Sequence, residues 1–156
     1  MAEDAGVTLH LIKLCVGIDR VEQLAASQKR RRAELEAQGL PPYSRHLTRN
    51  FPRRADEIAA GTVQGGSLYW VIRREVRVRQ PLHAIEEAVD HQGRRCCALV
   101  FEPELIRVMP RPHRPFQGWR YLEAADAPAD LPADAVDESA DMPAEMRREL
   151  RALGLL

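Results

Sequence analysis

The clearest candidate for binding chemistry in this chain is a run of arginines between residues 45 and 54. These guanidinium groups surround one aromatic ring, Phe51, and Pro52 then opens a predicted helical turn whose free backbone amides also favour anions. This composition is typical of phosphate binding, and a solvated basic loop paired with acidic residues elsewhere explains it equally well. The arginines of this candidate site are Arg45, Arg49, Arg53 and Arg54.

A second basic group lies within residues 67–79, close to Trp70. If residues 76–79 form a strand, Arg77 and Arg79 project from one face while Val76 and Val78 face the core. A basic stripe beside an aromatic ring suits phosphate contact and stacking with single strands or extruded bases. The alternative is an ordinary polar outer face of a sheet. We include Ser67, at the start of the preceding strand, in the candidate ligand site.

The two tryptophans have different surroundings in the sequence. Trp70 shares a strand face with Leu68 and Ile72, which predicts a core residue. Trp119 instead lies in the segment 114–122, where aromatic rings, arginines, a glycine and an amide that can bond a base edge are crowded together. We expect this segment to be a functional loop. Its candidate ligand-binding residues are Gln117, Trp119 and Arg120.

Evidence for catalysis is thin. Ser67 follows Gly65-Gly66 but lacks the second glycine of a nucleophile elbow, which favours a turn residue entering a strand. The five histidines are scattered singly, and the chain contains no phosphate-cradling loop. We therefore expect no cofactor, no metal site and no catalytic residue. The alternative is a small hydrolase or nuclease that uses Ser67 or a metal held by scattered acids and histidines.

The elements that must position these residues are predicted from hydrophobic periodicity and from glycine and proline punctuation. The pattern indicates helices over Val21–Ala37 and Arg53–Ala60, and strands over Val7–Val16, Ser67–Ile72, Val76–Leu82, Arg95–Phe101 and Leu105–Met109. Several short strands at hairpin spacing predict an α+β fold, a small curled sheet or β-barrel with flanking helices. The segment 73–75 is a predicted turn.

The formal net charge of zero hides a strong asymmetry along the chain. Of the 23 basic and 23 acidic residues, residues 120–156 hold four basic and nine acidic ones, which leaves 19 and 14, a formal +5, in residues 1–119. Such a split is typical of a chain with an anionic partner or with an acidic segment that mimics one. We divide the chain into an α+β domain, 1–122, and an acidic tail, 123–156, rich in alanine and proline. The tail ends in a predicted helix over 143–153 that could support self-association. We expect the acidic tail to fold back across the basic body, residues 1–119.

Composition restricts the class of protein. With 156 residues and 45% hydrophobic content the chain suits one globular domain. Its longest apolar stretches, Leu68–Ile72 and Cys96–Phe101, are far shorter than the roughly 20 residues that cross a membrane. The acidic N-terminus does not resemble a secretory signal. The three cysteines have no spacing typical of a disulfide framework. We expect a cytoplasmic protein without membrane contact.

Five segments together resemble a bacterial family of unknown function, DUF 1489. They are Leu9–Gly17, Arg54–Ile58, Gly65–Ile72, Cys97–Val100 and Arg114–Leu122. The resemblance covers about residues 7–131 and implies a housekeeping role without naming an activity. More distantly, the helix of the Arg-Ala-Asp-Glu-Ile type, the Gly-Ser strand with Tyr69-Trp70 and the Pro-Phe-Gln-Gly-Trp stretch are similar to the PUA-like superfamily, which includes ASCH, EVE and YTH domains. That likeness implies a small barrel that binds RNA or modified bases. It places the pocket between the segment 45–54, the start of the Ser67 strand and the loop 117–119.

Together these observations predict a non-catalytic module that binds RNA or a modified or extruded nucleobase. Two alternatives stay open from the sequence: the hydrolase or nuclease described above, and an adaptor whose basic body meets an acidic protein.

Overall fold

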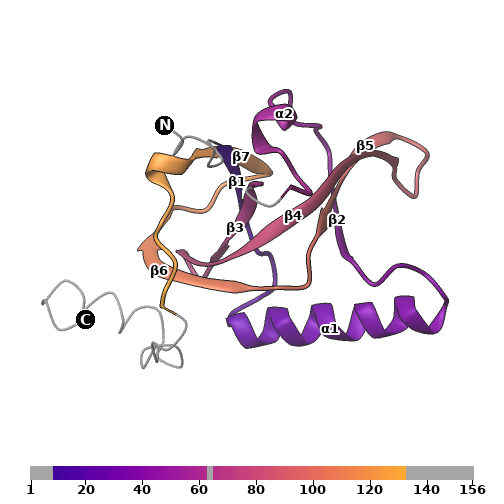
Figure 1. The fold of residues 1–156 in the computed structure, drawn as a ribbon, viewed down its shortest axis with the longest axis horizontal. Coiled ribbons are helices and arrows are strands. Elements are labelled where there is room, and N and C mark those ends of the chain that lie inside the picture. The colour runs from indigo at the N-terminus through magenta and orange to yellow at the C-terminus, as the bar shows by residue number, and fades with distance from the viewer. Residues whose placement is uncertain (1–8, 63–64, 133–156) are drawn as a thin grey trace, which may run out of the picture.

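A mixed β-sheet forms the centre of the fold, which the computed structural model describes for residues 9–62 and 65–132 (Figure 1). The described residues contain seven strands and two α-helices, which makes the fold α+β. In chain order the elements are β1 (Leu9–Leu14), α1 (Val21–Ala37), β2 (Ser44–Thr48), α2 (Ala55–Ile58), β3 (Ser67–Ile72), β4 (Glu75–Val89), β5 (Arg95–Phe101), β6 (Ile106–Pro112) and β7 (Trp119–Glu123). A short 3-10 turn, Ala124–Asp126, follows β7.

The strand order is β2-β5-β4-β3-β1-β7, and β6 pairs with the first half of β4. β1 and β3 are parallel, and the other pairs are antiparallel. Within the described residues the two end strands, β2 and β7, do not pair with each other, so the sheet is not closed. The predicted α+β class is therefore confirmed, and the prediction of a β-barrel is wrong.

β3 buries both of its faces, as its continuous apolar run from Leu68 to Ile72 indicates. On one face Leu11 and Leu68, together with Trp70, belong to a cluster that also includes residues of α1 and β5. On the other face Ile12 and Tyr69 pack in a second cluster against β6 and its neighbours. These two faces position different sets of side chains along β1, β3 and β7.

β4 is longer than predicted because its two halves pair with different strands of the sheet. Its first half, up to Pro81, pairs with β3, and its second half, from Leu82, pairs with β5 (Figure 1). A β-bulge interrupts the first half, since Trp70 is opposite Val78 and Val71 is opposite Val76. Arg77 is therefore the extra residue of the bulge.

This bulge corrects the predicted stripe of arginines on β4. Val76 and Val78 lie in different core clusters, on opposite faces of the sheet, because the extra residue shifts the alternation between them. Arg77 is only 4% exposed. Arg79 donates to both carboxylate oxygens of Asp130, at 2.7 and 2.8 Å. The two arginines thus do not form an exposed basic face.

Helix α1 has the bounds predicted from its sequence. It buries Val21 and Leu24 against the sheet and exposes most of its charged remainder along the edge of the molecule (Figure 1). Gln28 fixes the helix further, since its amide and that of Gln80 exchange hydrogen bonds of 3.0 and 2.8 Å. Among the described residues no helix is both long and apolar enough to span a membrane.

The chain after β7 turns back along the outer side of β6. The backbone N–H of Met109 donates to the carbonyl of Ala129 at 2.8 Å, and that of Leu131 donates to the carbonyl of Arg107 at 2.9 Å. The first residues of the acidic tail therefore lie on the body. The helix predicted over 143–153 lies outside the described residues.

Candidate functional site

A cleft with a volume of about 600 Å³ lies between the segment 48–53 and the start of β7. We call it the aromatic cleft. Its lining contains no acidic residue and consists of Thr48, Arg49, Asn50, Phe51, Arg53, Gln117, Gly118, Trp119 and Tyr121. The cleft thus combines aromatic rings with positive charge and with amide groups.

Trp119 is held in the wall of this cleft by its neighbours. Its indole Nε1 donates to the backbone carbonyl of Asn50 at 3.0 Å, which ties β7 to the segment after β2. Its ring contacts the edge of Tyr121, with centroids 5.0 Å apart. The Tyr121 hydroxyl in turn accepts the backbone N–H of Arg54 at 3.0 Å. These contacts set the position of the indole before any ligand arrives.

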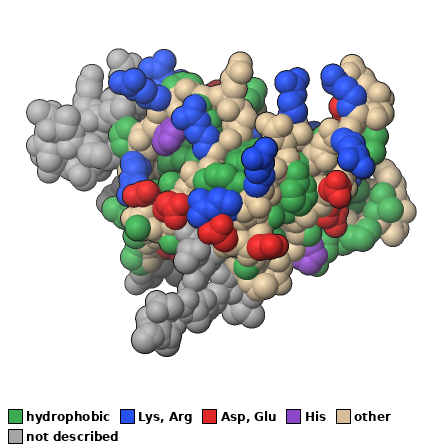
Figure 2. Space-filling model, turned by 90° about the horizontal axis from the view of Figure 1, so that it is seen from above, with side chains coloured by type: hydrophobic (Ala, Val, Ile, Leu, Met, Phe, Trp, Pro, Cys, Tyr) green, Lys and Arg blue, Asp and Glu red, His purple; other side chains and the backbone are tan. Residues whose placement is uncertain are grey.

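The arginines around the cleft differ in how they are engaged. Arg54 forms two hydrogen bonds of 2.7 Å with Glu57 and a longer one with Glu123, so its charge is largely balanced. Arg49 and Arg53 are exposed and have no hydrogen bond or ion pair within residues 9–62 and 65–132. On the face over β7 and α2, basic side chains are spread out, with acidic ones in a band beside them (Figure 2). As far as the described part of the chain shows, the guanidinium groups of Arg49 and Arg53 therefore have no partner.

A second cavity, of about 260 Å³, lies beside α1. We call it the helix pocket. Its walls come from the end of β1, from α1 and from the start of β2, and its floor includes Trp70 and Phe101. Lys13, Arg31 and His46 supply its basic groups, whereas Arg45 alternates with His46 on β2 and projects its side chain to the opposite face.

One row of side chains across the sheet connects these two cavities. Lys13 on β1 is in register with Trp70 on β3 and with Trp119 on β7. Residues in register on neighbouring strands project to the same face. Lys13 therefore lies between the two tryptophans, with the helix pocket on the side of Trp70 and the aromatic cleft on the side of Trp119.

The structure brings four of the predicted ligand-binding residues together in the aromatic cleft. They are Arg49, Arg53, Gln117 and Trp119. Arg45 lines the helix pocket instead and forms a weak exposed ion pair, 3.9 Å long, with Glu86 of β4. Arg54 adjoins the cleft but is bound to acidic neighbours, as described above.

The other predicted residues lie elsewhere. Arg120 alternates with Trp119 on β7, so it projects to the opposite face, where its guanidinium lies 4.9 Å from the centre of the Phe116 ring. Ser67 is fully buried, and Arg77 is buried in the bulge. Arg79 is held by Asp130.

The geometry around Ser67 does not favour a hydrolytic role. Its hydroxyl accepts a hydrogen bond from Arg79 at 2.8 Å, and its backbone N–H donates to Nδ1 of His10 at 3.0 Å. A nucleophile needs a base in contact with its hydroxyl and access for the substrate. In the part of the chain that the structure describes, no group of three His, Cys, Asp or Glu residues is arranged to hold a metal ion.

Sequence reasoning missed several residues that line the two cavities. Lys13 alternates along the chain in step with Leu9, Leu11 and Cys15, which are buried. A lysine on the buried face of a strand is a signal of a binding site that could have been used. His46 and Arg31 gave no such signal, because their meeting depends on how β2 packs against α1.

Comparisons with known proteins give a family but no activity. No curated protein and no solved structure matches the chain. The likeness to the PUA-like superfamily thus has no support from these comparisons, and the open sheet also differs from the barrel that it implied. A family model matches residues 11–156, nearly the whole chain, so the protein belongs to the family of proteins of unknown function DUF1489.

Proposed function

We propose that this protein binds single-stranded RNA, or an unpaired base within RNA, in the aromatic cleft. The observation that carries the proposal is the lining of the cleft, which contains no carboxylate and where Arg49 and Arg53, unpaired among the described residues, lie with Phe51 and Trp119. Guanidinium groups contact phosphates, and aromatic side chains stack on bases of any sequence.

The neutral groups of the cleft support the same proposal. Gln117 is exposed, and its side-chain amide offers both a donor and an acceptor to the edge of a base. Phe51 is 43% exposed and lines the cleft, so its ring is accessible for stacking with a base. The rings of Trp119 and Phe51, the amide of Gln117 and the two arginines together form a platform for one or two nucleotides.

A charge-reversal experiment tests the proposal. The double variant Arg49→Glu with Arg53→Glu should bind a labelled single-stranded RNA at least about tenfold more weakly than the unaltered protein in fluorescence anisotropy. The dependence of log affinity on log salt should also become shallower, by about 0.7 for each lost phosphate contact.

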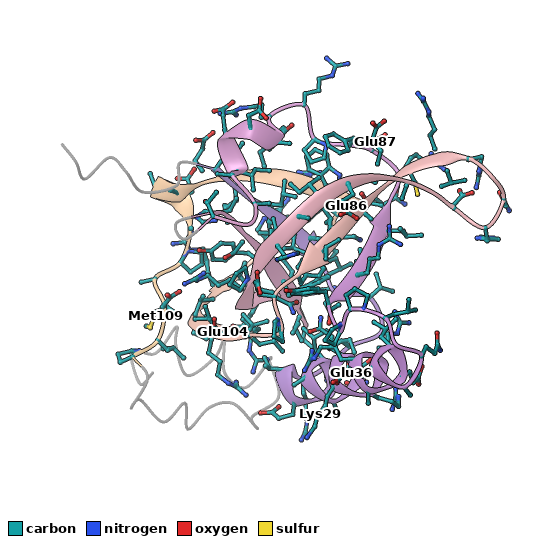
Figure 3. All side chains as sticks on the ribbon, turned by 45° about the vertical axis from the view of Figure 1, so that its right-hand side comes forward. Lys29, Glu36, Glu86, Glu87, Glu104 and Met109 are labelled. Atoms are coloured by element: carbon teal, nitrogen blue, oxygen red, sulfur yellow. The ribbon has the colours of Figure 1, made fainter. Side chains whose placement is uncertain are left out.

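The matched control changes the same number of charges at another place. Lys29 and Arg30 are exposed on α1, and Lys29 projects from the side of the helix away from the sheet (Figure 3). Lys29→Glu with Arg30→Glu should leave RNA affinity within about twofold of the original, since these residues are outside the cleft. Equal losses in both double variants, or no RNA binding at low salt, would contradict the proposal.

A further inference from the structure

The helix pocket is a separate cavity whose chemistry the proposed RNA site does not use. At about 260 Å³ it is smaller than the aromatic cleft. It lies between three elements that are distant in sequence, since its walls come from the end of β1, one side of α1 and the first residues of β2. Its floor and its rim differ in chemical character.

The rim carries positive charge that no lining residue balances. Lys13 and Arg31 supply this charge, and no aspartate or glutamate lines the pocket. Lys13 and Arg31 have no hydrogen bond or ion pair within the described ranges, 9–62 and 65–132. Arg45 also borders the pocket, but it alternates with His46 on β2 and its guanidinium lies 3.9 Å from Glu86 on the opposite face, so it does not belong to the rim charges.

The half-buried position of Lys13 lowers the stability of the folded protein when no anion is bound. Its side chain is half-buried, and this burial lowers the pKa of its ammonium below the usual value. A partly desolvated charge without a partner destabilises the folded protein unless a counter-ion is bound. The position of Lys13 in a row with Trp70 and Trp119 keeps its stem against the sheet.

His46 shows that the positive charges converge on one place. Burial is the main reason why the pKa of its imidazole falls to about 4, and the charges of Lys13 and Arg31 lower it further. The ring meets Trp70 edge to face, with centroids 5.8 Å apart. At neutral pH His46 is uncharged, so one ring nitrogen can donate a hydrogen bond to an anion.

The floor of the pocket is apolar and rigid. Trp70 is held by a hydrogen bond of 3.2 Å from its Nε1 to Oε1 of Gln80, which is fully buried and also bonds to Gln28 of α1. Leu24 and Phe101 lie beside it in the lining. A ligand in this pocket can thus place an anionic group among the rim cations and a small apolar group on the floor.

We propose that the helix pocket binds a small phosphomonoester, with its phosphate between Lys13 and Arg31 and beside the neutral ring of His46. A phosphate dianion balances both rim charges, whereas a carboxylate balances only one. The volume leaves room for an apolar substituent next to the phosphate. This site does not depend on RNA binding in the aromatic cleft. The same phosphate chemistry could come from a free metabolite or from the 5′ end of an RNA.

Calorimetric titration of the full chain at low salt with phenyl phosphate, inorganic phosphate and phenol tests the proposal. Phenyl phosphate should bind about tenfold more tightly than inorganic phosphate, because its ring covers the apolar floor, while phenol should not bind. Lys13→Gln and, separately, Arg31→Gln should weaken phenyl phosphate binding by about tenfold or more. The control Lys29→Gln should change it by less than about twofold. Because Arg31 is exposed, its replacement leaves the core intact if Lys13→Gln fails to fold.

A second pair of titrations distinguishes the two sources of phosphate. Adenosine 5′-monophosphate stands for a free phosphomonoester, and a short RNA with either a 5′-phosphate or a 5′-hydroxyl stands for an RNA end. A gain in affinity from the 5′-phosphate that Arg31→Gln removes identifies the RNA end, and tight binding of the monophosphate alone identifies a metabolite. No binding of phenyl phosphate at about 10 mM, or equal losses in Arg31→Gln and Lys29→Gln, would overturn the site.

Discussion

At the scale of single residues, the two tryptophans on either side of Lys13 differ in what they contribute. Trp70 is 4% exposed and its indole nitrogen is hydrogen-bonded to buried Gln80. Trp119 is only partly buried, at the border of the same cluster. The sequence predicted that Trp70 is a core residue, because Leu68 and Ile72, two positions away on either side, are apolar. The structure confirms this prediction.

Alanine replacements should separate these contributions. Trp70→Ala should lower the free energy of unfolding by about 3–5 kcal/mol, the cost of removing a large buried aromatic side chain. Trp119→Ala should cost less stability and weaken RNA binding by about 1–3 kcal/mol, if a base stacks there as proposed. Chemical denaturation and RNA titration measure the two effects. The assignment fails if Trp119→Ala unfolds the protein and Trp70→Ala leaves stability unchanged.

His10 makes stability depend on pH. Its Nδ1 accepts the backbone N–H of Ser67, and its side chain is 7% exposed. Burial chiefly, and then the charge of Arg79, lower its pKa from 6.5 to about 4, against the opposing effect of Asp130. Between these two pH values the unfolded chain binds a proton that the folded protein does not. The free energy of unfolding therefore falls as the pH drops from 6.5 towards 4.

The expected size of this loss for His10 is about 3 kcal/mol at pH 4, and His46, whose pKa is lowered to a similar value, acts in the same direction. His10→Asn keeps an acceptor for the N–H of Ser67 but cannot titrate. Urea denaturation at several pH values should give a flatter curve for this variant than for the unaltered protein. Identical slopes in the two proteins would show that His10 is not responsible.

At the scale of elements, the turn between β3 and β4 departs from the usual chemistry of hairpins. Arg73 and Arg74 form its two-residue loop, since Ile72 pairs with Glu75. Both arginines have positive φ, 51° and 67°, a conformation that favours glycine and asparagine. The sequence prediction of a turn is confirmed, and the residues that form it are strained.

Replacing this loop should stabilise the protein. Arg73→Asn with Arg74→Gly fits the positive φ values without steric cost and should raise the free energy of unfolding by about 1–2 kcal/mol. Thermal and urea melts measure the change. Because both positions are outside the aromatic cleft, RNA affinity should stay nearly constant at moderate salt. A less stable variant would mean that the two arginine side chains contribute contacts that outweigh the strain.

Elements with a clear pattern were predicted well, and those that depend on tertiary pairing were not. α1, β3 and β5 have the predicted bounds, because their periodicity and their flanking glycines are local signals. β2 and β7 were missed, since each is a five-residue strand at an end of the sheet: β2 has only one apolar residue, and β7 places an arginine between two aromatic residues. The bulge at Arg77 has no local signal, so the arginine stripe predicted from strict alternation was wrong.

The candidate site was predicted only in part, for the same reason. Arg49 and Arg53 were identified from composition, as were Gln117 and Trp119, and the structure places these four in one cleft. Their meeting follows from the pairing of β7 with β1 and from the bond between Trp119 and Asn50, which no local pattern shows. The helix pocket, built from three distant segments, was not predicted at all.

At the scale of the whole molecule, the acidic tail is expected to compete with RNA. Its first part already balances a basic residue, because Asp130 binds Arg79. A chain ending at Pro132 keeps this contact and loses six of the nine acids that follow residue 120. Because the tail is tethered, its effective concentration near the body is high. The shortened protein should therefore bind RNA more tightly at low salt, and by a margin that disappears at high salt.

The control for this deletion is stability. The shortened protein should melt at a temperature close to that of the full chain if the residues after Pro132 do not contribute to the core. If it folds and binds RNA no better at low salt, the tail does not act as a competitor.

The most direct test of the proposed RNA site follows the indole N–H signals of the two tryptophans by NMR during titration with a short single-stranded RNA at low salt. Trp119 lines the aromatic cleft, whereas Trp70 lies in the core beyond Lys13. The proposal predicts a saturable shift of the Trp119 signal, weakened by Arg49→Glu with Arg53→Glu, and a smaller change for Trp70. RNA binding that leaves the Trp119 signal in place would contradict it.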